Sequence, residues 1–221
     1  ITQKMCFSAG ASFISGAIIS SVGVACIAKV KKPTQVVFAI IPLLFGVQQI
    51  TEGVVWLALP SPDLEILQKF ATYAFLLFAQ IIWPTIIPLS VLNMEENQKR
   101  KKPLKILLFT GMAVSLYFTF CLLFFNVYPQ IKSYHIIYAT DFPQALKHVV
   151  FSFYLIATIT PFFISSNRRM YYFGSLMFLS CAVTAIVYFE HLTSVWCFFA
   201  ALLSVTILFI LRSTNKKLKL E

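Results

Sequence analysis

Three side chains that could bind a ligand or carry a proton stand inside the long apolar segment Ile40–Leu59. Gln48 and Gln49 precede Glu52 by four and three residues, so on a helix all three share one face, which Trp56 extends by a turn. A carboxylate at the centre of a membrane span costs about 2.5–3.5 kcal/mol, and it normally faces a partner or a water-filled cavity. We therefore predict a ligand-binding site on this face, with Glu52 as its proton- or cation-binding group.

Six more polar or aromatic residues are expected to line the same cavity: Gln80, Trp83, Glu190, His191, Trp196 and Cys197. A structural explanation exists beside the functional one. Glu52 can serve helix association through a glutamine or through a serine of the first span. Glu190 and His191 can form a solvated turn, and the tryptophans can pack or lie at the membrane interface. No Ser-His-Asp arrangement can be assembled and no glycine-rich phosphate loop is present, so catalytic residues stay unassigned.

A metal site would have to come from one set of residues, because the chain has only three histidines. Thiolate, carboxylate and imidazole ligands suit zinc. The set is Cys6, Glu52, His135, His148 and His191. No histidine pair has the spacing of a metal motif, so we expect no cofactor, with zinc as the alternative.

Composition indicates the class of protein in which these residues work. The chain has 221 residues, of which 59% are hydrophobic and 12% charged, and its mean hydropathy is +0.82. Such values predict an all-α, polytopic transmembrane seven-helix bundle in a single membrane domain, without a soluble domain. The net charge of +10 is explained by loop charges that set topology, so nucleic acid is not an expected partner. The predicted spans are 7–28, 36–59, 70–92, 104–125, 146–164, 171–189 and 192–211.

Basic residues predict the orientation of the bundle. Of the 18 Lys and Arg residues, 14 fall in alternate connections and the C-terminal tail and only 4 on the opposite side. This bias places the C-terminus in the cytoplasm and the N-terminus outside. Glu52 would then lie about 24 Å up its helix from the cytoplasmic side, in the outer third of the membrane. An outward-facing polar cavity with its floor near Gln48, Gln49 and Gln80 follows from this placement.

Two further patterns concern the elements around the predicted cavity. Pro84 and Pro88 withhold backbone donors in the third span, so this helix should kink within the membrane. The long connection 126–146 has a strand-like composition, which favours a short hairpin or a segment lying across the mouth of the bundle.

Three stretches resemble an uncharacterised bacterial family of multi-span membrane proteins. They are Met-Cys-Phe-Ser-Ala from Met5, Gln-Gln-Ile-Thr-Glu-Gly from Gln48, and Trp-Cys-Phe-Phe-Ala from Trp196. The resemblance covers nearly the whole chain and implies a multi-pass protein of the bacterial inner membrane, in which Ile1–Lys4 would be an upstream extension. It implies no activity.

Three functions are compatible with these patterns. The favoured one is a membrane protein that binds or transports a small molecule or an ion through the cavity around Glu52. One alternative is a membrane-embedded, metal-dependent hydrolase that acts on lipid at the outer leaflet. The other is a sensor or an accessory subunit of a larger membrane complex. The expected partners are the lipid bilayer and a small-molecule, ion or lipid ligand. The sequence leaves the oligomeric state and the question of an enzyme open.

Overall fold

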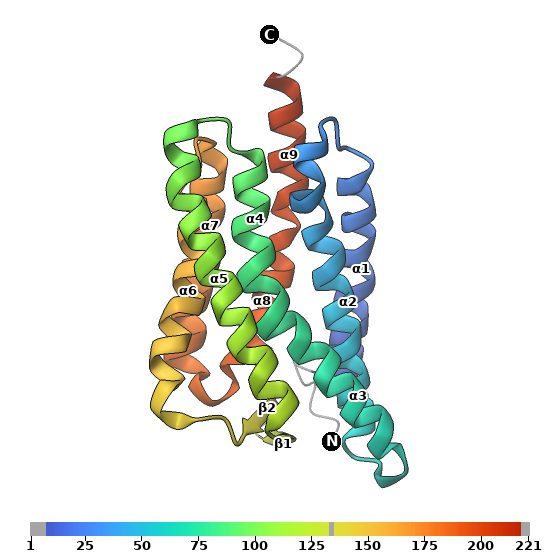
Figure 1. Cartoon of the computed structure of the whole chain (residues 1–221). Helices are drawn as coiled ribbons and strands as arrows, with labels where there is room; N and C mark the ends of the chain where they lie inside the picture. The colour runs from blue at the N-terminus through green and yellow to red at the C-terminus, as the bar shows by residue number, and fades with distance from the viewer. Residues whose placement is uncertain (1–7, 133–134, 218–221) are drawn as a thin grey trace.

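A bundle of roughly parallel and antiparallel helices makes up the computed structural model of the chain, which describes residues 8–132 and 135–217 (Figure 1). Within these residues, seven helices are long and apolar enough to cross a membrane, which confirms the predicted all-α fold. The elements are α1 (Ala9–Ile27), α2 (Val36–Ala58), α3 (Glu65–Leu76), α4 (Trp83–Met94), α5 (Gln98–Phe124), β1 (Val127–Lys132), β2 (His135–Thr140), α6 (Lys147–Ile164), α7 (Arg168–Val187), α8 (Leu192–Ser204) and α9 (Thr206–Lys217).

The two ends of the bundle differ in charge. One end, here called the basic end, holds the α1–α2, α4–α5 and α6–α7 connections and the end of α9 (Figure 1). The opposite end, here called the hairpin end, holds the start of α1 and the strands β1 and β2. Of the 14 basic residues counted above, 13 lie in described segments of the basic end, and Lys219 lies outside the described residues. The side of the membrane that each end faces remains a prediction.

Helices α1 and α2 meet along small residues, as the serine and glycine pattern of the first span predicts. A side chain added at Gly23 would overlap the backbone of Leu43, and one added at Gly46 would overlap Ser20. Such residues let two backbones approach closely, which strengthens dispersion contacts where apolar burial gives little advantage in lipid. The α1–α2 pair therefore forms a firm wall behind the face that carries Glu52.

The third span is longer than predicted and is bent. It runs without a break from Glu65 through Met94, as α3, a π-helical segment (Leu77–Ile82) and α4. Its α3 part leans away from the bundle in Figure 1. The predicted kink is confirmed next to Pro84, which has no N–H to continue the α-helical ladder, and the kink takes the form of a π segment. The backbone N–H of Trp83 reaches back to the carbonyl of Phe78.

Side chains from other helices satisfy carbonyl groups of the π segment. In the π register the Ala79 carbonyl would accept from residue 84, which is proline. The Tyr154 hydroxyl on α6 donates to this carbonyl instead, at 2.7 Å. The Ser115 hydroxyl on α5 donates to the Ile81 carbonyl at 2.6 Å. The bend is therefore held from two sides by neighbouring helices.

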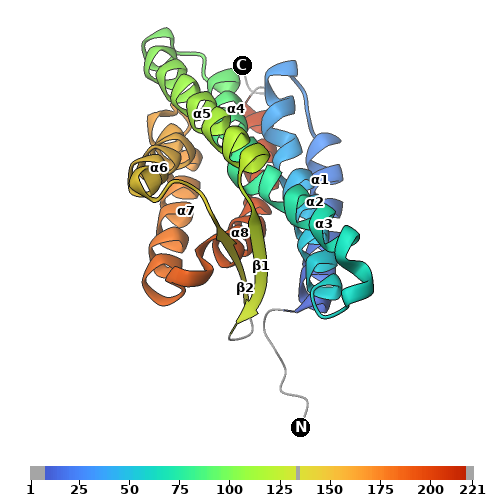
Figure 2. The same ribbon diagram turned by 60° about the horizontal axis from the view of Figure 1, so that its bottom comes forward.

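A β-hairpin lies across the mouth of the bundle, so both expectations for the connection 126–146 are met. β1 and β2 pair antiparallel, from Val127 opposite Thr140 to Lys132 opposite His135. Figure 2 shows the hairpin between α3 on one side and α7 and α8 on the other. Ile136 of β2 is fully buried, in a cluster with residues of α2 and α3.

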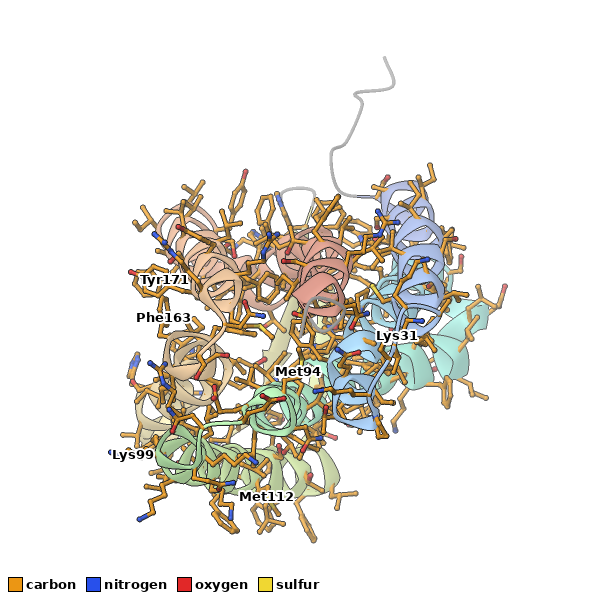
Figure 3. All side chains as sticks on the ribbon, turned by 90° about the horizontal axis from the view of Figure 1, so that it is seen from above. Lys31, Met94, Lys99, Met112, Phe163 and Tyr171 are labelled. Carbon is orange, nitrogen blue, oxygen red and sulfur yellow. The ribbon has the colours of Figure 1, made fainter. Side chains whose placement is uncertain are left out.

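The periphery of the bundle is apolar, as expected of helices that face lipid. Viewed down the bundle from the basic end, Met94 lies near the centre, whereas Met112, Phe163 and Tyr171 point outwards (Figure 3). These three side chains are 49%, 37% and 52% exposed. Large exposed apolar side chains at this density would be unfavourable in water.

The fourth helix begins earlier than predicted. The segment 104–125 was expected to follow a charged connector, but α5 already begins at Gln98 and includes the lysines of that connector. The reason is local, because Asn97 Oδ1 accepts the backbone N–H of Lys99 at 2.9 Å and caps the helix. The last span differs as well, since it is divided into α8 and α9 and continues to Lys217.

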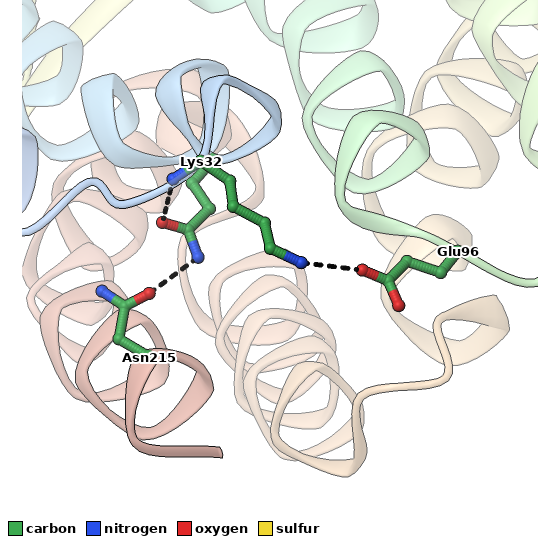
Figure 4. A network of polar contacts seen from close by, with 4 residues as sticks. Lys32, Glu96 and Asn215 are labelled. Carbon is green, nitrogen blue, oxygen red and sulfur yellow. Dashed lines mark hydrogen bonds and ion pairs between the residues drawn. The ribbon is translucent and has the colours of Figure 1, made fainter. Parts of the chain in front are cut away.

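Polar contacts join the connections at the basic end. The Gln35 amide accepts the backbone N–H of Lys32 at 3.4 Å and donates to Asn215 Oδ1 at 2.8 Å (Figure 4). Asn215 in turn donates to the Lys29 carbonyl at 2.6 Å. Lys32 pairs with Glu96 at 3.3 Å. The α1–α2 connection, the α4–α5 connection and α9 are thereby linked at the basic end.

Candidate functional site

Glu52 lies in the interior of the bundle and is 2% exposed. The Ser194 hydroxyl on α8 donates to its Oε1 atom at 2.5 Å. The helix-association hypothesis expected a glutamine or a serine of the first span as the partner of Glu52. Gln49 does lie near the carboxylate, whereas the bonded serine belongs to the last span, so the contact joins the second span to the last. Ser194 is not among the predicted site residues, because its small size is its only signal in the sequence.

Gln48 lies one turn from Glu52 towards the basic end and is fully buried. Its Oε1 atom accepts the indole N–H of Trp83 at 2.8 Å, and Trp83 stacks on Phe45 with ring centroids 3.8 Å apart. The Cys197 thiol of α8 lies beside Gln48. The structure thus brings together three predicted site residues from three different spans.

Tyr138 of β2 reaches down into this cluster and was missed as a site residue. Its ring stacks on Phe75 with centroids 4.9 Å apart. Burial, followed by the neighbouring charges of Glu52 and Cys197, raises the pKa of Tyr138 well above its ordinary value. The hairpin therefore covers Glu52. Its only signal in the sequence is weak, an aromatic residue in a strand-like run.

Several buried polar atoms of this region lack a hydrogen-bond partner among the described residues. An unsatisfied buried polar group costs about 1–3 kcal/mol, and in natural proteins such groups are few. Gln49 lies near the Glu52 carboxylate, but neither atom of its amide has a hydrogen bond of good geometry within the described chain. The other such atoms are Gln48 Nε2, the Tyr138 hydroxyl and Trp196 Nε1. The predicted site residue Gln80 lies in the π segment, where its Oε1 atom also has no hydrogen-bond partner in the described chain.

The cluster is closed in this structure. Glu52 is buried beneath the hairpin, whereas the sequence predicted a carboxylate that lines a cavity open to the outside. A small cavity of about 20 Å³ does lie next to the cluster, between Trp83, Trp196 and Cys197. This volume holds about one water molecule. The difference from the prediction arises because Ile136 and Tyr138 fill the mouth of the bundle.

Three predicted site residues lie around the edge of the cluster. Trp56 packs with Ala71 and Ile136 beneath the hairpin. Glu190 lies at the surface, where it pairs with Lys132 of β1 at 2.7 Å. His191 is half-buried at the start of α8, and its ring centroid lies 4.7 Å from that of His135.

The histidine pair has an electrostatic consequence. Burial, followed by the positive charge that His135 can carry, lowers the pKa of His191, and the nearby Glu190 offsets part of this effect. The described residues contain no group of three or more His, Cys, Asp or Glu side chains that could hold a metal ion. Of the predicted ligands, His135 and His191 are together, Glu52 is bonded to Ser194, His148 is exposed on α6, and Cys6 lies outside the described residues.

These features define a class of protein, namely an all-α protein with seven helices suited to a membrane and a buried carboxylate among them. The chain belongs to the family of unknown function DUF6629, whose profile matches residues 5–220. The resemblance found in the sequence is thereby confirmed. No curated protein and no solved structure matches the chain.

Proposed function

We propose that this protein binds a small polar solute at the Glu52 cluster and carries it across a bacterial inner membrane, with Glu52 exchanging a proton or a cation. The observation that carries the proposal is the set of polar atoms around Glu52 that lack partners in the described chain. A bundle whose only task was to pack would gain stability from apolar side chains at these positions. Polar atoms held at this cost are explained if a ligand or water completes their hydrogen bonds in another conformation.

The chemistry of the cluster suits a solute that both donates and accepts hydrogen bonds. The amides of Gln48 and Gln49 can donate, and Gln49 Oε1 and the Glu52 carboxylate can accept. A carboxylate within a span also favours a positively charged group or a proton beside it. We therefore expect a small amine or a similar polar molecule rather than an anion.

The hairpin is the proposed outer gate. β2 closes the mouth through Ile136 and Tyr138, while the exposed ion pair of Lys132 and Glu190 fastens the hairpin to the start of α8. An exposed pair of this kind contributes little stability and so permits opening. The π segment of the third span, held by Tyr154 and Ser115, would stay in place while the hairpin opens, and such segments are frequent at functional sites.

The orientation rests on the distribution of basic residues, which places the basic end in the cytoplasm. Reporter fusions at Lys102 and Lys217 should then be active as cytoplasmic fusions, and those at Pro62 and Ser133 as external ones. A reporter found on the wrong side at Lys102 or at Ser133, the two central positions of the four, would remove the outward gate from the proposal.

The direct test compares wild-type protein with Glu52→Gln, which keeps the shape of the side chain and removes the charge. Purified protein in nanodiscs is screened for thermal stabilisation by a panel of small amines, amino acids and polyols, at acidic and at alkaline pH. We expect at least one compound to stabilise the wild type in a pH-dependent way. Glu52→Gln should remain folded, because the amide is cheaper to bury than an ion, and should lose the pH dependence.

Glu96→Gln is the matched control, since Glu96 is an exposed glutamate at the other end of the bundle. It should behave as the wild type in the same screen. If Glu52→Gln kept the wild-type pH dependence, Glu52 would serve packing only. A compound found in the screen is then tested for uptake into proteoliposomes. Binding without uptake would mean that the protein is a receptor and would reject the proposal that it is a transporter.

A further inference from the structure

A second polar recess lies beside the hairpin. It is a groove of about 450 Å³ between the first turns of α3 and strand β1, at the hairpin end. One wall is a stripe of α3 residues at helical spacing: Glu65, Gln68, Lys69, Thr72 and Tyr73. The volume is within the range of sites that hold small molecules.

The polarity of α3 is the reverse of that of a helix on the surface of a water-soluble protein. Its polar stripe faces the groove, whereas Ile66 and Phe70 are 89% and 73% exposed. In a protein that spans a membrane, such exposed apolar side chains face lipid. The groove therefore opens beside the lipid-facing surface of α3.

The opposite wall comes from the segment that begins β1. Asn126, Tyr128 and Gln130 contribute polar groups to it. The Tyr128 hydroxyl donates to Asp141 Oδ2 at 3.1 Å, and this bond, followed by burial and the Asp141 charge, raises the pKa of Tyr128. Tyr128 is thus held in place in the wall, with its single O–H already donated to Asp141.

Two opposite charges and one buried hydroxyl in the groove lack partners. Glu65 and Lys69 are one helical turn apart, yet within the described residues neither forms an ion pair. Thr72 is 1% exposed, lines the groove, and its Oγ1 atom has no hydrogen-bond partner in the described chain. A threonine in a helix usually bonds a carbonyl of the preceding turn, so this hydroxyl is available to a ligand.

We infer that this groove binds a zwitterion with a primary ammonium group and a phosphate joined by a short linker. Glu65 would take the ammonium group, while Lys69 and the Thr72 hydroxyl would take the phosphate. The lining charges cancel, so neither a simple anion nor a simple cation is favoured. Side chains one turn apart are about 5–6 Å apart at their Cβ atoms, a gap that a two-carbon linker can bridge. The headgroup of phosphatidylethanolamine and free phosphoethanolamine share this chemistry.

The experiment uses the full-length protein in phosphatidylcholine nanodiscs. In one arm, phosphatidylethanolamine is added and the lipid retained by the protein is measured by native mass spectrometry. In the other arm, soluble phosphoethanolamine is titrated calorimetrically. We expect either the lipid or the soluble compound to bind, and about tenfold weaker binding in Glu65→Gln, in Lys69→Gln and in Thr72→Val, since each loses a charged or hydroxyl contact.

The controls separate this site from the proposed transport site. Asp63→Asn removes a neighbouring charge that does not line the groove, and Glu52→Gln alters the buried cluster, so both should bind as the wild type does. Thr72→Val keeps the shape of the side chain, which makes it the variant least subject to misfolding. Equal binding of phosphatidylethanolamine and phosphatidylcholine together with no binding of phosphoethanolamine, or unchanged binding in all three groove variants, would overturn the inference.

Discussion

Glu95, at the end of α4, offers a sharp test of how the basic end is held together. Its side chain is 3% exposed although it stands next to the solvent-exposed Glu96. Its carboxylate accepts the backbone N–H of Ser166 and that of Asn97, at 2.7 and 2.9 Å, and the Ser166 hydroxyl at 2.7 Å. One glutamate thereby joins the α4–α5 connection to the α6–α7 connection.

Glu95→Gln replaces one of the two accepting oxygens by an amide nitrogen, which cannot accept the hydrogen bonds donated to that position. At least one charge-assisted bond is lost, at about 1.5–3 kcal/mol, and a buried N–H or hydroxyl group loses its partner. We expect a loss of about 2–3 kcal/mol in the free energy of unfolding. For a chain of this size, that corresponds to a fall of about 4–12 °C in the midpoint of thermal unfolding. Glu96→Gln breaks an exposed pair with Lys32 and should lower the midpoint by no more than about 2 °C.

The same comparison has a defined pH dependence. Burial of Glu95 opposes ionisation, but the hydrogen bonds from Ser166 and Asn97 and the nearby Arg100 charge outweigh it, so the pKa is lowered from its ordinary value of 4.5. A group with a lowered pKa in the folded state stabilises the protein fully above its unfolded pKa. This stabilisation is lost as the pH falls through the folded pKa. The difference between wild type and Glu95→Gln should therefore shrink in acid.

The measurement is thermal unfolding in detergent, followed by tryptophan fluorescence at neutral pH and over an acid series. Glu95→Gln and Glu96→Gln are compared in the same preparation. Equal midpoints for the two variants, or a Glu95→Gln deficit that grows in acid, would refute the assignment of Glu95 as the link between the two connections.

Three further predictions use the same unfolding measurement. Tyr154→Phe should destabilise by about 1–3 kcal/mol, because it leaves the buried Ala79 carbonyl without its donor; an unchanged midpoint would contradict this. Tyr138→Phe should leave the midpoint unchanged or raise it, because its buried hydroxyl has no partner in the described chain; a clear fall would reveal a partner. Gln35→Ala and Asn215→Ala should show a coupling energy of about 0.5–3 kcal/mol in a double-mutant cycle, and simple additivity would mean that α9 does not depend on Gln35.

The helices were predictable because their signal is a long apolar run, which depends on composition and not on contacts. The third span shows where that reasoning ends. Pro84 predicts a break in the hydrogen-bond ladder, but a proline kink and a π segment are equally compatible with the sequence. The structure decides because the Tyr154 hydroxyl reaches the Ala79 carbonyl, a contact between residues far apart in the chain. The early start of α5 depends in the same way on a local cap by Asn97.

Of the candidate site, only the part that depends on local helical spacing could be predicted. Gln48, Gln49 and Glu52 could be placed on one face because helical spacing alone determines it. Their partners could not be predicted, since Ser194 and Tyr138 come from segments more than 80 positions away in the printed sequence. Closure over Glu52 also depends on the hairpin, whose position across the mouth is a tertiary property. Glu95 was assigned to a charged connector because its burial has no local signature.

The distribution of satisfied and unsatisfied polar groups bears on which end of the bundle would open in the proposed function. At the basic end, Gln35, Glu95 and Asn215 are all bonded to other connections, so separating these connections would break several hydrogen bonds at once. At the hairpin end, the Tyr138 hydroxyl and the Gln49 amide have no partner among the described residues, so lifting the hairpin there breaks few bonds and exposes groups that gain by hydration. For the proposed gate we therefore expect opening at the hairpin end rather than at the basic end. A solute that supplies the missing partners at Glu52 would favour the conformation that admits it, which is the coupling that a gated binding site requires.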